Sequence, residues 1–171
     1  ASTIATNALL GQIGLELPRV VFVTTEGFRD VIEIGRQNRS RVYDLFVTRP
    51  RPLVARDDRI TVRERTNHRG EATHALDDAE IERVVDAVRA RSPQSIAVGF
   101  LHAYANPEHE RRLGAAIARA LPEVPVSLSS QVDPSYREYE RFSTTVVNAA
   151  LQPIVRRYLE RLRDGLRARN F

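Results

Sequence analysis

The run SIAVGFL at residues 95–101 is apolar almost throughout, as in a strand that is covered on both faces of a sheet. The dipeptide Asn106-Pro107 follows it and is typical of a helix start, with proline at the first helical position. The helical pattern ends before Pro122, and VPVSL at 124–128 predicts the next strand. A strand, a helix and a strand with short connections predict a βαβ unit, in which the two strands are parallel.

The N-terminal half contains two more regular elements and one irregular segment. The β-branched run RVVFVT at 19–24 predicts another buried strand. A helix is expected after Asp77, which has the position of an N-cap. Apolar residues follow it at helical spacing: Ile81, Val84, Val85 and Val88. Residues 38–75 are rich in arginine, aspartate and proline, which predicts an irregular insertion with an antiparallel pair at 59–65 and 71–75.

The C-terminal part of the chain predicts one long helix over 138–169. An apolar residue recurs at every fourth position from Phe142 to Leu166. Pro153 is expected to kink or split this helix. Together these patterns predict a single α/β domain over 1–171, with a mixed open sheet, a parallel βαβ unit and a long C-terminal helix.

The composition excludes several classes of enzyme. The chain has no cysteine, which excludes disulfides, thiolate metal ligands and cysteine nucleophiles. All 26 basic residues are arginine, so a phosphate loop of the Walker type, a pyridoxal Schiff base and a lysine general base are excluded as well. The four histidines lack the spacing typical of zinc ligands, and we expect no metal site.

The net charge of +4 is concentrated near the C-terminus. Residues 153–171 carry six arginines and two acidic residues, so this segment accounts for the whole net charge. A basic helix of this kind can bind nucleic acid, which is one alternative function. The plainer interpretation is a solvent-exposed helix face, with cations well placed near the helix C-terminus.

The sequence also bears on location and processing. No apolar stretch approaches the roughly 20 residues that span a bilayer, and no signal-peptide pattern opens the chain. We therefore expect a cytoplasmic protein without a membrane partner. Because the chain starts at Ala1 and contains no methionine, we also expect a processed chain or a piece of a longer one.

Polar side chains follow the predicted strands, at the edge where ligands bind in open parallel sheets. His102 is the sharpest candidate, because an imidazole at this place can serve as acid, base or phosphate ligand. The alternative is a histidine that only hydrogen-bonds the following loop. Near the start of the long helix, Arg141, Thr144 and Asn148 share one helical face, which predicts a pocket lining. The alternative there is a helix start held by surface ion pairs.

Eight short stretches also follow one another in a familiar order. They are TIATNALL at 3–10, VTTEGFRD at 23–30, IGRQ at 34–37, YDLF at 43–46, FLHAYANP at 100–107, VSLSS at 126–130, REYER at 137–141 and STTVVN at 143–148. In this order and spacing they resemble the N-terminal region of the hydantoinase A/5-oxoprolinase family. The likeness extends over almost the whole chain.

The resemblance implies half of an actin-like (ribonuclease H-like) ATPase domain. Members of this family open cyclic amides such as hydantoins, N-methylhydantoin or 5-oxoproline with ATP and Mg²⁺, and related subunits serve in acetone carboxylases. The A-type subunit is implied to phosphorylate the carbonyl oxygen of the substrate, and a B-type subunit to complete the hydrolysis. Such phosphoryl transfer depends mainly on positioning and charge stabilisation.

The resemblance also implies site residues, without assigning a chemical step to any of them. His102 and Arg141 are implied as catalytic residues. Six more are implied to bind substrate or phosphate: Thr3, Thr6, Asn7, Arg36, Thr144 and Asn148. The chain lacks the family's Asp-x-Gly-Gly-Thr hairpin and its large C-terminal domain, so we expect a fragment that is inactive alone and holds no ATP. The expected partners are that C-terminal domain, a B-type subunit and a small cyclic amide. A nucleic-acid-binding module and a purely structural lobe remain the alternatives.

Overall fold

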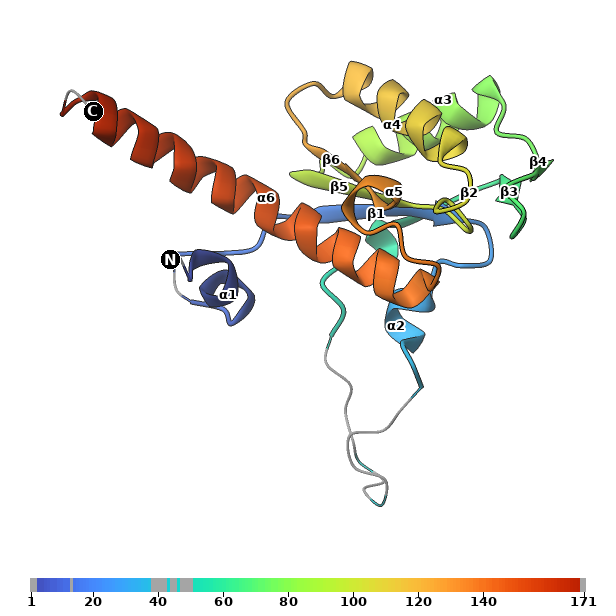
Figure 1. Ribbon diagram of the computed structural model, residues 1–171, viewed down its shortest axis with the longest axis horizontal. Coiled ribbons are helices and arrows are strands. Elements are labelled where there is room, and N and C mark those ends of the chain that lie inside the picture. Colours follow the sequence, from blue (N-terminus) through green and yellow to red (C-terminus); the bar gives the residue numbers. More distant parts are fainter. Residues whose placement is uncertain (1–2, 13, 38–42, 44–45, 47–50, 170–171) are drawn as a thin grey trace.

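The computed structural model describes residues 3–12, 14–37, 43, 46 and 51–169. They form three layers, in which helices cover both faces of a four-stranded parallel sheet (Figure 1). The strand order is β2-β1-β5-β6, with the bounds β1 Val20–Thr25, β2 Arg59–Val62, β5 Ser95–Gly99 and β6 Val126–Leu128. The expected α/β fold with a parallel βαβ unit and a long C-terminal helix is confirmed, and the four strands of the main sheet are all parallel.

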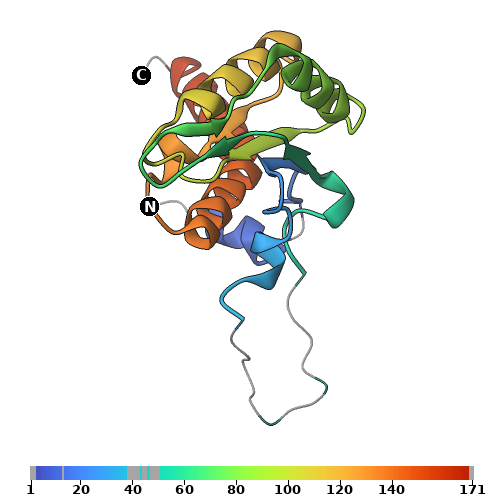
Figure 2. The same cartoon turned by 90° about the vertical axis from the view of Figure 1, so that its right-hand side faces the viewer.

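The helices are divided between the two faces of the sheet (Figure 2). One face is covered by α3 (Asp78–Arg89) and α4 (Glu108–Ala120), and the other by α6 (Glu138–Arg167). The short helices are α1 (Ile4–Leu9), α2 (Val31–Ile34), α5 (Ser129–Val132) and the 3₁₀ turn η1 (Arg56–Asp58). Among the described helices, none has the length and the apolar character that a membrane span requires.

The sheet separates two apolar cores. In β1, Val21 and Val23 pack toward α3 and α4, whereas Val20 and Phe22 pack toward α6. This alternation follows from the pleat, which sends successive side chains to opposite faces. All four side chains are almost fully buried, as expected for the apolar part of a central parallel strand that is covered on both faces.

The βαβ unit is present as expected. Strands β5 and β6 pair in parallel, with Ile96 opposite Val126 and Val98 opposite Leu128, and α4 connects them. The predicted N-cap is also present, because the Asp77 side chain accepts a hydrogen bond of 2.7 Å from the backbone N–H of Glu80.

The antiparallel pair predicted at 59–65 and 71–75 is only partly correct. Residues 59–62 form β2, which joins the main sheet parallel to β1. The antiparallel pair is limited to β3 (Arg65–Thr66) and β4 (Ala72–His74), which form a separate two-stranded sheet. Strand β2 pairs with the main sheet because this pairing buries Ile60 and Val62 in the core beneath α3. Most of residues 38–50, the first part of the predicted insertion, lies outside the described residues.

Helix α6 is one continuous element of 30 residues that runs through Pro153 without being split there. At 1.5 Å per residue its length is about 45 Å. The predicted apolar stripe is buried only in the first half, from Phe142 to Ile154. Leu162 and Leu166 belong to the same stripe but are exposed, because the second half of α6 extends beyond the sheet (Figure 1).

Candidate functional site

All four strands of the main sheet end at the same edge because they are parallel. The turn Phe100–Ala105 follows β5, and α5 begins at Ser129 directly after β6. In open parallel sheets this carboxyl edge is the usual place for a ligand. The described residues at this edge form two buried polar clusters and one histidine at the rim.

The first cluster is centred on Glu110, which is completely buried on α4. Its carboxylate accepts hydrogen bonds from the backbone N–H of Phe100 at 2.8 Å, from the Ser129 hydroxyl at 2.6 Å and from the backbone N–H of Ser130 at 2.9 Å. Burial raises the pKa of Glu110, and these hydrogen bonds counteract part of the rise. Glu110 thus ties the end of β5 to the start of α5.

Arg141 completes this cluster from the α6 side. Its completely buried guanidinium donates to the Ser129 hydroxyl at 3.1 Å, to the Ser135 carbonyl at 2.6 Å and to the Phe100 carbonyl at 2.8 Å. The guanidinium also lies 5.6 Å from the ring centre of Tyr104. Burial lowers the pKa of Arg141, although nearby carboxylates oppose this. The structure therefore places Arg141 inside the protein, where it holds three loop ends together.

The second cluster contains Glu64, Thr25 and His109, which are all buried. The Thr25 hydroxyl donates to the Glu64 carboxylate and accepts the backbone N–H of Leu101 at 2.9 Å. His109 Nε2 accepts the backbone N–H of Leu76 at 3.4 Å, so Nδ1 carries the proton and donates to Glu64 at 2.8 Å. These contacts join the ends of β1 and β2 to α4.

The sequence interpretation missed Glu64 and Glu110 and considered His109 only as a metal ligand. One signal could have found Glu110, because it shares a helical face with Leu113 and Ile117 at i+3 and i+7. A charged residue on an otherwise apolar helical face is expected to be buried with partners.

His102 lies at the rim, between β5 and the β3–β4 pair. Its backbone has a positive φ of 54°, a conformation that costs energy in a residue other than glycine. Its Nδ1 lies 2.8 Å from the Thr66 carbonyl oxygen, which can only accept a hydrogen bond. Nδ1 therefore carries a proton, and in the neutral imidazole the lone pair is on Nε2, which has no hydrogen-bond partner among the described residues.

The remaining predicted residues are not gathered at this edge. Thr3, Thr6 and Asn7 belong to the first turns of α1, which packs on α6 near Ile154 and Tyr158. Ile154 follows Arg141 by 13 residues, so along the helix axis the two positions are about 20 Å apart. Figure 1 shows α1 far from β3, the strand whose Thr66 carbonyl contacts His102.

The other three predicted residues are on the outside of α6 and beside it. Arg36 follows α2 and pairs with Glu140 at 2.7 Å. Thr144 is exposed and donates to the Glu140 carbonyl, and Asn148 is exposed and donates to the Ser127 hydroxyl at 3.0 Å. The structure thus buries Arg141 completely and leaves Thr144 and Asn148 exposed. A pocket lined jointly by these three residues stays a prediction.

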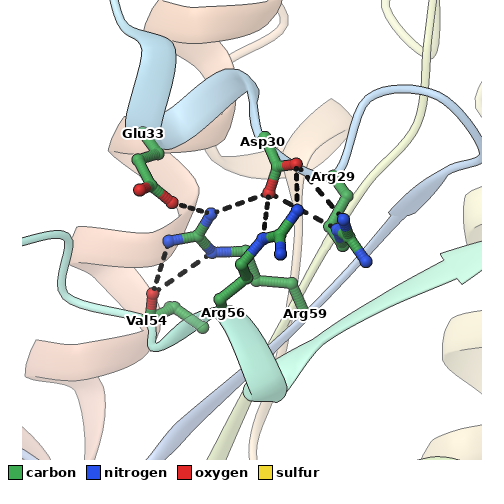
Figure 3. Close-up of polar contacts among 6 residues, drawn as sticks. All are labelled: Arg29, Asp30, Glu33, Val54, Arg56 and Arg59. Atoms are coloured by element: carbon green, nitrogen blue, oxygen red, sulfur yellow. Dashed lines mark hydrogen bonds and ion pairs between the residues drawn. The ribbon is translucent and has the colours of Figure 1, made fainter.

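A third polar cluster joins the two ends of the segment between α2 and η1 (Figure 3). Asp30 accepts hydrogen bonds of 3.2–3.4 Å from Arg29, Arg56 and Arg59. The Arg59 side chain is almost completely buried and also donates to Glu33 at 2.7 Å and to the Val54 carbonyl at 3.1 Å. Hydrogen bonds from Arg56 and Arg29 lower the pKa of Asp30 to about 2.

This low pKa predicts a pH-dependent stability. Because the folded-state pKa lies below the ordinary value of 3.8, the contribution of Asp30 is present above about pH 4 and is lost as the pH falls to 2. The side chain is one-third exposed, and after allowance for solvent screening we expect Asp30→Asn to cost at most about 1 kcal/mol at pH 7. Denaturant unfolding at pH 7 and pH 2.5 measures this. The exposed Asp86→Asn is the control, and an equal loss at both pH values would contradict the prediction.

Known proteins are similar to this chain in both sequence and structure. The family model described as hydantoinase/oxoprolinase N-terminal region matches residues 1–121. A caprolactamase alpha subunit of Pseudomonas jessenii is 37% identical over 163 residues, which cover 94% of this chain and 23% of the relative. The crystal structure of the ATP-dependent caprolactamase of that species superimposes with a TM-score of 0.86 at 36% identity, over 97% of this chain and 24% of that one.

Two further relatives are also similar over almost the whole chain. An uncharacterized protein of Methanocaldococcus jannaschii is 41% identical over 171 residues, all of this chain and 25% of the relative. A 5-oxoprolinase of Saccharomyces cerevisiae is 31% identical over 190 aligned positions, 96% of this chain and 14% of the relative. The chain thus spans a quarter or less of the length of these relatives.

Proposed function

The chain belongs to the hydantoinase/oxoprolinase N-terminal region family, and from this premise we propose that it is part of an ATP-dependent enzyme that opens a cyclic amide ring. The observation that carries the proposal is the similarity over almost the whole chain to a caprolactamase and to a 5-oxoprolinase. Both names describe enzymes whose substrates are lactams. The specific ring, the cytoplasmic location and the inactivity of the isolated chain stay predictions.

The described residues do not by themselves offer a place for Mg²⁺. Among them, no group of three or more histidines, aspartates and glutamates is arranged to hold a metal ion. The two buried carboxylates at the carboxyl edge, Glu64 and Glu110, are already occupied by hydrogen-bond donors within the fold. We therefore assign no step to ATP or Mg²⁺ in this region. We propose that their ligands lie outside the described residues and that a B-type partner is a separate part of the enzyme.

We propose that this region contributes His102, the histidine at the rim, to the ring-opening reaction. The Thr66 carbonyl fixes the tautomer of His102 and leaves the Nε2 lone pair available to a bound molecule. At this position Nε2 can accept a hydrogen bond from the N–H of a cyclic amide, or it can take a proton from water. Arg141 then acts as a positioning residue, because its bond to the Phe100 carbonyl holds the turn that carries His102.

Substitution of His102 in the complete polypeptide tests this role. His102→Asn keeps a donor for the Thr66 carbonyl and tolerates the positive φ, but it places nothing where Nε2 was. We expect ATP-dependent ring opening to fall by about 100-fold, at the lower end of the range for general acid–base groups. The assay measures turnover of 5-oxoproline, caprolactam and hydantoin, together with the melting temperature.

Two results separate this role from its alternative. His74→Asn, at an exposed histidine on β4, is the matched control and should retain turnover. If His102→Asn retains both full turnover and normal stability, the histidine only anchors the loop. The region would then be a structural lobe, as the sequence interpretation allowed.

A further inference from the structure

The second half of α6 carries an apolar seam that nothing in the described structure covers. The seam consists of Val155, Leu159, Leu162 and Leu166. The spacing of four, three and four residues is the a/d period with which one helix packs along another. The three leucines are between 44% and 54% exposed, which is high for side chains in such a regular pattern.

The seam borders a hollow on the outer face of α6. This hollow has a volume of about 740 Å³, and its lining includes Leu151, Val155 and Leu159 together with Arg156 and Arg163. On the adjoining side of the helix, Ile154 and Tyr158 line a smaller hollow with Ile4 of α1, which packs on α6. The seam thus begins beside the contact with α1 and shares Leu162 and Leu166 with the exposed part of the predicted stripe.

The charge around the seam limits what can bind it. The segment 153–171 holds six arginines and two acidic residues. Both acidic residues are engaged within the helix, Glu160 with Arg156 at 3.0 Å and Asp164 with Arg163 at 3.1 Å. A second copy of the helix would bring a net charge of +4 against an equal charge, which is unfavourable. A helix with an apolar stripe and acidic flanks is complementary.

The length of the relatives indicates where such a helix comes from. The caprolactamase subunit and the Methanocaldococcus jannaschii protein are about four times as long as this chain. We infer that the seam binds an apolar helix with aspartate or glutamate at its flanks, supplied by the part of the longer polypeptide outside these 171 residues. The inference rests on the family but not on the proposed chemistry of His102.

The proposed interface also explains why the second half of α6 remains helical. From Val155 onward no residue of α6 is buried, so the helix end has little tertiary support. Helical segments of this length are marginal in water when nothing packs on them. Docking of the acidic helix would bury the leucines and pair the arginines, which stabilises the second half of α6.

Photo-crosslinking in the complete polypeptide identifies the occupant. A benzoyl-phenylalanine placed at position 162 should crosslink to a peptide of the same chain that contains apolar residues and several carboxylates. Mixing isotope-labelled with unlabelled protein distinguishes this product from a crosslink between two copies. A crosslink to a second copy, to a separate subunit or to copurified nucleic acid would overturn the inference, and so would no crosslink.

Hydrogen exchange supplies an independent measurement. In the complete polypeptide, Leu159→Gln with Leu162→Gln should speed amide exchange over residues 155–167 by about tenfold or more. Ala168→Gln, at the exposed C-cap residue that follows α6 and lies outside the seam, is the control and should leave the exchange unchanged. Unchanged exchange in the double variant would show that the seam is not covered. Because turnover is not measured here, failure of this inference is distinct from failure of the proposed function.

Discussion

Replacing Arg141 by alanine is expected to lower the free energy of unfolding by about 3–5 kcal/mol. The guanidinium is completely buried and donates to two carbonyls and one hydroxyl, of which the Phe100 carbonyl and the Ser129 hydroxyl are buried and would lose their donor. Each buried acceptor left without a donor costs about 1–3 kcal/mol. The Glu110 carboxylate nearby would also lose a compensating positive charge. Urea unfolding of wild type and variant at pH 7 measures the difference.

The matched control for Arg141→Ala is an arginine whose ion pair is on the surface. Arg89 pairs with Asp86 at 2.7 Å, and both side chains are more than half exposed. Arg89→Ala should therefore change stability by no more than about 1 kcal/mol. A double-mutant cycle of Arg141→Ala with Ser129→Ala should show coupling, because the two side chains share a hydrogen bond. Additive effects, or a loss below 1 kcal/mol at Arg141, would refute the buried-network interpretation.

Replacing Gly99 by valine is expected to cost about 3 kcal/mol, the upper end of the usual cost of overpacking a core. A Cβ at this position would lie 2.5 Å from Cδ1 of Phe142 and 3.2 Å from a ring carbon of Phe22. The two rings are packed 5.4 Å apart beneath α6 and are completely buried, so neither can move aside. Helix α6 would have to move away from the end of β5. Thermal and denaturant unfolding measure the loss.

Gly165 is the control that the chain itself provides. It lies in the exposed part of α6, and an added Cβ would meet nothing within 4 Å. Gly165→Ala should stabilise the protein by about 0.5–1 kcal/mol, since alanine is the better helix former. Adding Phe142→Leu to Gly99→Val should recover part of the loss, because the smaller side chain relieves the clash. If Gly99→Val unfolds like wild type, the close packing of α6 on β5 is wrong.

The local pattern of the sequence was sufficient for the central part of the fold. The apolar runs at 19–24, 95–101 and 124–128 all became parallel strands, and the apolar spacing after Asp77 became α3. These elements could be predicted because periodicity and capping act between residues close in the chain. His102 was placed correctly at the carboxyl edge for the same reason, since it directly follows a strand.

Only the tertiary structure determined which distant residues meet. Residues 59–62 joined the parallel sheet because a hydrophobic core offered Ile60 and Val62 more burial than a hairpin could. Glu110 and Arg141 became part of one buried network through hydrogen bonds between segments that are distant in the sequence. The packing of α1 on α6 likewise separated Thr3 from His102. Helical spacing can mark Glu110 as buried, but no local pattern names its partners, because these are determined by which segments the fold brings together.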